Sequence, residues 1–540
     1  MFKKFTAAMI LVALFAIPAF SADEANNPIN ALSQRPEKSI YAMTQVKNLS
    51  GFLSWLLSRE NLNIAAKFAE DGMLDADTIE IICNIVENLN LTDTALIGGN
   101  DTGTIDAFFA QAAFKIKDGN EELLQNFKSG KADANDVAKL LIGNSALTPM
   151  LASMLDVKFD NGIYTISSMA FLSVMPDDVF ILASSVEEIF KAVAAYKGDA
   201  RAIDNIARKF DTPDFIYTHS DCGLLGSFDK DVEKEIAKYF KQPLNIETAF
   251  NVQPDKFILS MYGNFREALA DKYTAKVDKY VPVKGGHINF DAVGGAGSPL
   301  FAIGMTIDMD EIKDLSVFKD LLNNIKFIRR FGITNDDLIK FLNGAFSLVI
   351  NDSVPFMGLK LPAVFFSQTS EAAPAVFEKL ANAKQFSEIK TDYAYWEKLL
   401  QADNSLSPVS CLVGKSGNTL GVSIAEATSF AARPVLNPTL QNIADSEGFS
   451  ALWADFGGFQ KWLQDTGALG MFGMIAMASG AGEEYKAFAD IMNAKFSVPY
   501  ISFSVPAIEM MNFEFGLADV PAGEGVLSKV ADAYVKFGKK

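Results

Sequence analysis

Hydrophobic positions along the chain follow two periods, the alternation typical of strands and the spacing of three to four residues typical of helices. The run 257–262 is typical of a strand, while 312–325 carries apolar residues at helical spacing. Strand segments lie too close together in the sequence for the long crossovers that parallel pairing needs. We therefore predict an α+β fold in which mainly antiparallel sheets carry packed helices.

The same series of strand and helix segments occurs twice. The strand at 39–44 matches 299–304, and further matches follow in the same order about 235–260 residues later in the chain. The best-marked pair is 214–223 with 448–457, in which a Phe, an Asp and a Gly coincide. Preserved order over many segments predicts two tandem similar modules. The alternative is that strand and helix patterns recur in any α+β chain.

Glycine clusters mark the boundary between the two copies. The segment 285–298 has Gly pairs on both sides of a short apolar stretch, which is typical of a linker. We predict a signal peptide at 1–21, a first module at 22–284 and a second module at 299–540.

The N-terminus has the pattern of a cleavable export signal. Lys3 and Lys4 precede an apolar run at 7–17, and small residues follow it. Cleavage after Ser21 fits this pattern best, with cleavage after Ala22 as the alternative. Because the run is too short to span a bilayer, it should not anchor the chain in the membrane. We therefore expect an extracytoplasmic protein, periplasmic or secreted. An N-terminal core helix is the other interpretation.

Composition narrows the function classes. The formal net charge is −18 at pH 7, and loss of Lys3 and Lys4 with the signal would make it about −20. Such a field repels nucleic-acid phosphates and anionic lipid surfaces, so we expect no nucleic-acid partner. The 44 Phe residues predict a large aromatic core, with an apolar ligand cavity as the alternative.

One long uncharged segment follows in the second copy. Residues 466–482 carry no charge and contain five Gly, and no run of spanning length occurs after the signal. We therefore expect no transmembrane segment once the signal is removed. Because Gly is costly inside a helix, we predict a buried, closely packed helix. The alternative is a segment that touches lipid, with Met471, Met474 and Met477 as pliable contacts.

Histidine and cysteine are scarce. The two His residues, His219 and His287, give no basis for a His-rich metal site, and we predict neither a metal nor a cofactor. Cys83 lies in an apolar helical stretch and should be buried. Three Cys residues allow one disulfide at most in an oxidising compartment, and the sequence leaves open whether Cys222 and Cys411 pair.

The duplication argues against a Cys–His nucleophile. His219 and Cys222 are three residues apart on a predicted strand, so their side chains should point to opposite faces. The second copy has Trp453 and Phe456 at the matching positions. A catalytic pair that belonged to the module should persist in both copies, so we predict no catalytic residue.

Asp221 and Asp455 are the acids that coincide between the copies, each two residues before a Gly. This spacing predicts an Asx turn or a helix cap. The alternative is a pair of glycosidase-like carboxylates, but nothing in the sequence brings two acids into one cleft. The sequence contains no nucleotide-binding loop, EF-hand or nucleophile-elbow motif.

The stretch 179–191 has the pattern of a strand, a short break and a helix. In the second copy, 439–443 and Phe449 are followed by an apolar strand and helix over 453–463. This pattern resembles an uncharacterised bacterial family of secreted domain-of-unknown-function proteins with duplicated α/β modules. The resemblance covers about half of each copy. It implies an envelope location, and the family has no assigned activity to transfer.

Export, duplication, richness in Phe and Met, and missing catalytic groups favour a non-enzymatic exported envelope protein that binds a lipid or other apolar ligand. The first alternative is a structural or assembly protein of the cell envelope, with an envelope protein as its partner. The second alternative is a carboxylate-dependent hydrolase.

Overall fold

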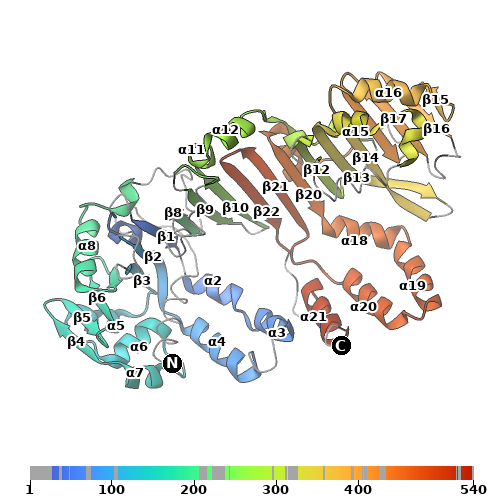
Figure 1. Cartoon of the computed structure of the whole chain (residues 1–540). Coiled ribbons are helices and arrows are strands. Elements are labelled where there is room, and N and C mark those ends of the chain that lie inside the picture. Colours follow the sequence, from blue (N-terminus) through green and yellow to red (C-terminus); the bar gives the residue numbers. More distant parts are fainter. Residues whose placement is uncertain are drawn as a thin grey trace. The chain divides into compact units, whose positions relative to one another are not determined.

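The computed structural model (Figure 1) shows the predicted α+β class. It divides into two compact units, Met1–Thr274 with Val530–Lys540 (unit 1) and Ala275–Lys529 (unit 2). The predicted signal peptide and Cys222 lie outside the described residues. The residues that the structure describes are 27–35, 39–47, 49–68, 74–101, 108–205, 216–221, 238–242, 244–253, 255–294, 297–309, 313, 326–356, 359–390, 395–403, 406, 410–424, 433–518, 520 and 524–537.

Unit 1 is built on an antiparallel sheet. Its strands follow the spatial order β4-β5-β6-β7-β3-β2-β1-β8-β9-β10, and each neighbouring pair is antiparallel. The strands are β1 (Ile40–Val46), β2 (Leu91–Asn100), β3 (Phe108–Ile116), β4 (Val157–Asp160), β5 (Ile163–Ile166), β6 (Ala170–Val174), β7 (Phe180–Ala183), β8 (Ile216–Asp221), β9 (Asn245–Val252) and β10 (Lys256–Gly263).

Unit 2 is built on a second antiparallel sheet, in the order β15-β16-β17-β18-β14-β13-β12-β20-β21-β22. The strands are β12 (Phe301–Ile307), β13 (Gly344–Phe356), β14 (Leu359–Thr369), β15 (Phe386–Ile389), β16 (Lys398–Ala402), β17 (Cys411–Ser416), β18 (Thr419–Ile424), β20 (Ser450–Asp455), β21 (Tyr500–Ala507) and β22 (Met510–Gly516). A separate short pair joins β11 (Val283–Lys284) to β19 (Glu447–Gly448).

Helices fill the connections between strands (Figure 1). In unit 1 they are η2 (Pro28–Ala31), α2 (Leu49–Leu56), α3 (Arg59–Phe68), α4 (Ala76–Asn88), α5 (Glu121–Lys128), α6 (Ala134–Ile142), α7 (Thr148–Met154), α8 (Val186–Tyr196), η4 (Ala202–Asn205) and α11 (Phe265–Ala268). In unit 2 they are η5 (Gly285–His287), η6 (Phe290–Ala292), η7 (Lys326–Phe331), α15 (Asn335–Leu342), α16 (Ala373–Ala381), α17 (Pro438–Asp445), α18 (Phe456–Asp465), α19 (Ala468–Ala478) and α20 (Gly482–Asn493). The sequence ranges of α12 (Asp271–Val277) and α21 (Val526–Phe537) cross the division between the units.

The two sheets have the same topology, strand for strand. In each, the first strand in the sequence, β1 or β12, lies inside the sheet between the second strand and one that comes much later, β8 or β20. The third strand then pairs with the last strand of a four-stranded meander. Two sheets with the same order of antiparallel pairings confirm the prediction of two tandem similar modules.

The strand pairing corrects one detail of the sequence comparison. Met43 of β1 faces His219 of β8, whereas Ala302 of β12 faces Trp453 of β20. Because His219 and Trp453 are matched positions, Met43 corresponds to Ala302, and the match of the first strands was one residue out of register. The corrected register places both side chains in the interior, where each is fully buried.

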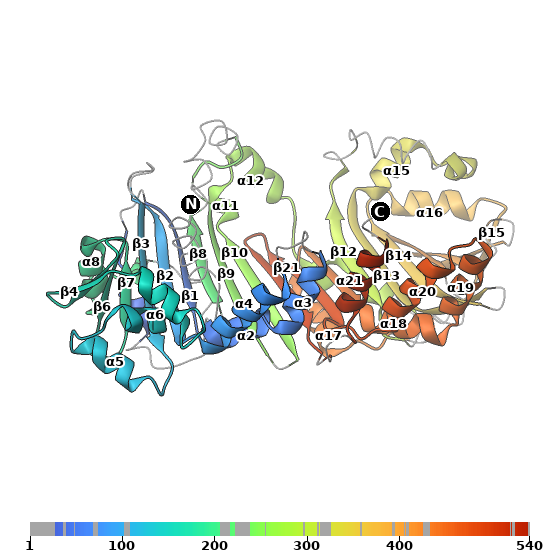
Figure 2. The same cartoon turned by 90° about the horizontal axis from the view of Figure 1, so that it is seen from below.

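Three Phe rings pack together in the core of unit 1. Phe180 stacks on Phe114 at 5.5 Å between ring centroids and meets Phe127 of α5 edge-on at 5.4 Å. On the other face of the same strands, Ile181 packs with Ile189 of α8. Helices α5 and α8 therefore cover opposite faces of β3 and β7 (Figure 2).

A buried ionic network holds the segment before β1. The Arg35 side chain is 1% exposed, with Nη2 at 2.6 Å from Glu188 Oε2 and Nη1 at 3.4 Å from Asp101 Oδ2. Its guanidinium lies over the Phe109 ring, 3.7 Å from the centroid. Gln111 Nε2 of β3 donates a second hydrogen bond to Glu188 Oε2 at 2.8 Å. The network ties the start of the described chain to β3 and α8.

The charge on Glu188 depends on this network. Burial alone would raise the pKa of its carboxyl, but hydrogen bonds and charges from Arg35 and Lys191 hold that pKa below its ordinary value. A carboxyl whose pKa is lowered in the folded state stabilises the fold above its ordinary pKa. That contribution disappears as the pH falls through the lowered value.

We expect Arg35→Met to lower the free energy of unfolding of unit 1 at pH 7 by about 3–5 kcal/mol, because the buried Glu188 carboxylate would lose its buried cation and keep only the more exposed Lys191. The difference from the unsubstituted chain should narrow as the pH falls through the lowered pKa of the Glu188 carboxyl, because protonation removes the charge that Arg35 offsets. Urea unfolding across a pH series measures this. Arg59→Met is the control: its pair with Glu80 is exposed, so it should change stability by less than about 1 kcal/mol. Equal losses for the two variants would contradict the role of the network.

Candidate functional site

The histidine and cysteine positions do not assemble a reactive site among the described residues. His219 lies on β8, and its presumed partner Cys222 falls outside the described range. In unit 2, His287 Nε2 lies 2.9 Å from Thr306 Oγ1, and burial lowers the pKa of the imidazole. Within the described part of the chain, no three His, Cys, Asp or Glu side chains are placed to hold a metal ion.

The described cysteines carry free thiols. Cys83 is buried on α4, as predicted from its apolar helical stretch. Cys411 is half-buried at the start of β17, and burial raises the pKa of its thiol. A buried thiol with a raised pKa is a poor nucleophile, so Cys411 is suited to packing rather than to catalysis.

Asp455 caps a helix, as its spacing from Gly457 predicted. Its Oδ1 accepts a hydrogen bond of 2.6 Å from the backbone N–H of Gly458, in the first turn of α18. Burial raises the pKa of this carboxyl, and the hydrogen bond from Gly458 partly offsets the increase. The matching Asp221 ends β8, and its side chain lies outside the described set.

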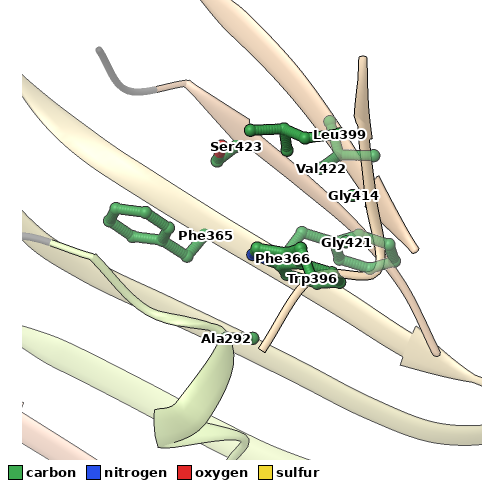
Figure 3. A pocket seen from close by; sticks show the side chains of 9 residues that line it. All are labelled: Ala292, Phe365, Phe366, Trp396, Leu399, Gly414, Gly421, Val422 and Ser423. Carbon is green, nitrogen blue, oxygen red and sulfur yellow. The ribbon is translucent and has the colours of Figure 1, made fainter. Parts of the chain in front are cut away.

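A pocket in unit 2 is too small for an organic ligand (Figure 3). Gly414 and Gly421 face each other across β17 and β18, and the Trp396 indole lies against both. The pocket beside the indole has a volume of about 10 Å³, enough for roughly one water molecule. Trp396 and Ser423 line this pocket, and Trp396 Nε1 and Ser423 Oγ are buried without a hydrogen-bond partner among the described residues. A pocket of this volume does not admit a lipid chain.

The most unusual surface belongs to the connection between β20 and β21. Helices α18, α19 and α20 form an arm of unit 2 beyond its sheet (Figure 1). On α19, the side chains of Met474 and Met477 are 64% and 67% exposed. These two residues are three apart and therefore lie on one helix face. The predicted burial of the helix at 466–482 was therefore wrong for this face, whereas Gly473 on the same helix is buried and closely packed.

Contacts within the arm fix α19 against α20. Tyr485 Oη donates a hydrogen bond of 2.6 Å to the Leu469 carbonyl. A Cβ at Gly473 would lie 2.7 Å from the Tyr485 ring, so this glycine allows the ring to approach the α19 backbone. At the base of the arm, Gln460 Nε2 donates to the carbonyls of Met492 and Ala494, at 2.5 and 2.6 Å. These contacts fix the backbone of α19, which carries the two exposed methionines.

Further exposed aromatic residues lie on the other two helices of the arm. On α18, Phe456 and Phe459 are 37% and 43% exposed, and on α20 Phe488 is 39% exposed. Phe459 stacks on Trp462 with ring centroids 5.9 Å apart. We call the five exposed side chains the arm surface: Phe456, Phe459, Met474, Met477 and Phe488. Exposed apolar residues on one helix face, such as Met474 and Met477, are typical of interaction sites in soluble domains.

The connection that carries the arm surface is longer than its counterpart in the first copy. The connection 456–499 between β20 and β21 is longer than the matching connection 222–244 between β8 and β9. Sequence reasoning located the helix and its methionines but did not predict their exposure. The length difference was the available signal, because an addition to one copy is not part of the shared scaffold.

Comparisons with known proteins add little. No model of a known protein family and no characterised protein matches the chain. A solved structure described as crystal form III of TP0453 is 9% identical, and the match covers 49% of this chain and 89% of that one, with a TM-score of 0.24. That score is too low to carry an argument. The resemblance to a secreted bacterial family stays a prediction.

Within the described residues, no helix is both long enough and apolar enough to cross a membrane. The arm helix α19 (Ala468–Ala478) falls short of the roughly 20 residues that a spanning helix needs.

Two glycines of α19 should respond oppositely to alanine. Nothing lies near the Cβ position of Gly470, so Gly470→Ala should stabilise the helix by about 0.5–1 kcal/mol. Gly473→Ala would collide with the Tyr485 ring and should loosen the contact between α19 and α20. Amide hydrogen exchange of the arm should slow in the first variant and accelerate in the second. The same response in both would show that Tyr485 does not hold α19.

Proposed function

We propose that this protein is an exported, non-enzymatic envelope protein that binds lipids or similar apolar molecules on the arm surface. The observation that carries this proposal is the exposure of Met474 and Met477 on an uncharged helix. A helix that is hydrophobic on all sides is stable when it is covered, and α19 leaves part of its surface to water. Methionine suits such a surface, because its flexible thioether adapts to irregular apolar partners.

The pocket in unit 2 supports binding at the surface rather than in an internal cavity. Its volume of about 10 Å³ is far below the roughly 300 Å³ or more of typical ligand pockets. The arm surface offers the exposed apolar area that this pocket lacks. The proposed site therefore differs from the internal cavity that the Phe content left open.

A role in envelope assembly is the second candidate, and the same exposed methionines favour it. Pliable methionine-rich surfaces also bind helices of protein partners. The hydrolase alternative has less support, since the Asp455 carboxylate that both copies share is used to cap α18. The export signal lies in the undescribed N-terminal range and is a prediction from the sequence.

Binding of a single-chain lipid tests the proposal. Monomeric lysophosphatidylcholine, below its micelle concentration, should bind the chain in isothermal titration calorimetry. Met474→Ser with Met477→Ser should weaken this binding roughly 100-fold or more, because burial of each Met side chain contributes ~1.5–3 kcal/mol.

The matched control is Met150→Ser with Met154→Ser on α7 of unit 1. These methionines are 53% and 48% exposed and lie four residues apart on one helix face. Their replacement should leave lipid binding unchanged. Absence of binding by the unsubstituted chain, or equal loss in the two double variants, would refute a lipid site on the arm.

A further inference from the structure

We propose that the arm surface docks on a lipid bilayer of no net charge, with α19 inserted into the outer part of one leaflet. This inference rests on the proposed function and narrows it from apolar molecules in general to a membrane surface. Four observations on the arm support it: the apolar character of α19 on all sides, its length, the charges at its ends, and its glycines.

The apolar character of α19 favours immersion over docking in a groove. The helix sequence Ala468–Ala478 contains no polar side chain, so no face of it prefers water. A helix that binds in a partner's groove buries one face and leaves the opposite face in water, where polar side chains are favoured. Helix α19 has no such polar face. An acyl-chain environment can cover every side that α20 leaves open.

The length of α19 limits how deeply it can enter. Eleven residues at 1.5 Å each give a helix of about 16 Å. The hydrocarbon core of a bilayer is about 30 Å thick. A helix of this length can lie within one leaflet but cannot cross both. The proposed binding is therefore peripheral and reversible.

The charges around α19 select the kind of surface. Asp465 precedes the uncharged stretch, and Glu483 and Glu484 follow it; all three are exposed. The connection 456–499 contains four acids and three Lys, and the whole chain carries −18. Anionic headgroups would repel both ends of the inserted helix, whereas zwitterionic headgroups would not. The chain is therefore complementary to a surface without net negative charge.

The glycines of α19 fit the same environment. Gly470 is exposed, and no atom lies within 4 Å of its Cβ position, so packing inside the arm does not require a glycine there. In water, a glycine inside a helix costs about 1 kcal/mol relative to alanine. Helices in lipid carry glycine more often than helices of soluble proteins do. The glycine content of α19 is thus in keeping with a helix that functions in lipid.

Vesicle flotation tests the proposal with the full chain. At low salt, the chain should float with phosphatidylcholine vesicles. Replacing half of the lipid by phosphatidylglycerol should reduce the floated fraction roughly fivefold, and 0.5 M NaCl should restore it, since salt screens the repulsion. Met474→Ser with Met477→Ser should abolish flotation, and Met150→Ser with Met154→Ser should not.

Depth can be measured with a single tryptophan substitution. Met477 is exposed, so Met477→Trp should leave the fold intact, which circular dichroism checks. Phosphatidylcholine with brominated acyl chains should quench the new fluorescence when the chain binds. The same lipid should not quench a Met154→Trp variant above the unsubstituted background.

The outcomes separate the two proposals. If lysophosphatidylcholine binds but the chain does not float, the arm takes single lipid molecules and the bilayer inference is overturned. If neither lipid form binds, the proposed function itself fails. Equal flotation with both vesicle types would overturn the charge argument. If crosslinking instead captures an envelope protein that only the Met474 and Met477 variant loses, the surface is a protein interface.

Discussion

Each sheet depends on its first strand, because that strand joins two groups of strands that are far apart in the sequence. In unit 1, residues 40–46 pair with 91–100 on one edge and with 216–221 on the other. Unit 2 closes its sheet through 301–307 in the same way. Such pairing carries a large loop-closure cost, which long-range contacts must offset. The buried Arg35 network lies directly before β1 and fixes the entry into this strand.

The sequence was sufficient for the class and the repeated order of elements, since strand and helix periods are local properties. The sequence comparison aligned the first strands of the copies one residue out of register, because short apolar segments such as 40–46 and 301–307 can be aligned in more than one way. Pairing with β8 and β20 sets the correct register, and this pairing joins residues far apart in the sequence. Asp455 was predictable as a cap because a capping bond spans three residues.

The arm surface could be predicted only in part. The composition of 466–482 gives an uncharged helix, and hydrophobicity then suggests burial. Whether this apolar helix is buried by the rest of the chain or by lipid depends on which tertiary contacts the segment makes. Here Tyr485 and α20 cover Gly473 and leave Met474 and Met477 to the outside. Periodicity contains no information about that choice.

Two copies of one topology in a single polypeptide create a hazard during folding, since a strand of one copy could enter the sheet of the other. The Trp396 indole, which packs against Gly414 and Gly421, would hinder such an exchange. The pairing registers set Ser173 and Ile181 of unit 1 at the positions of Gly414 and Gly421. If β7 entered the sheet of unit 2 in place of β18, the Ile181 side chain would occupy the position of the Trp396 indole. The difference between the two cores therefore disfavours exchange of strands between the copies.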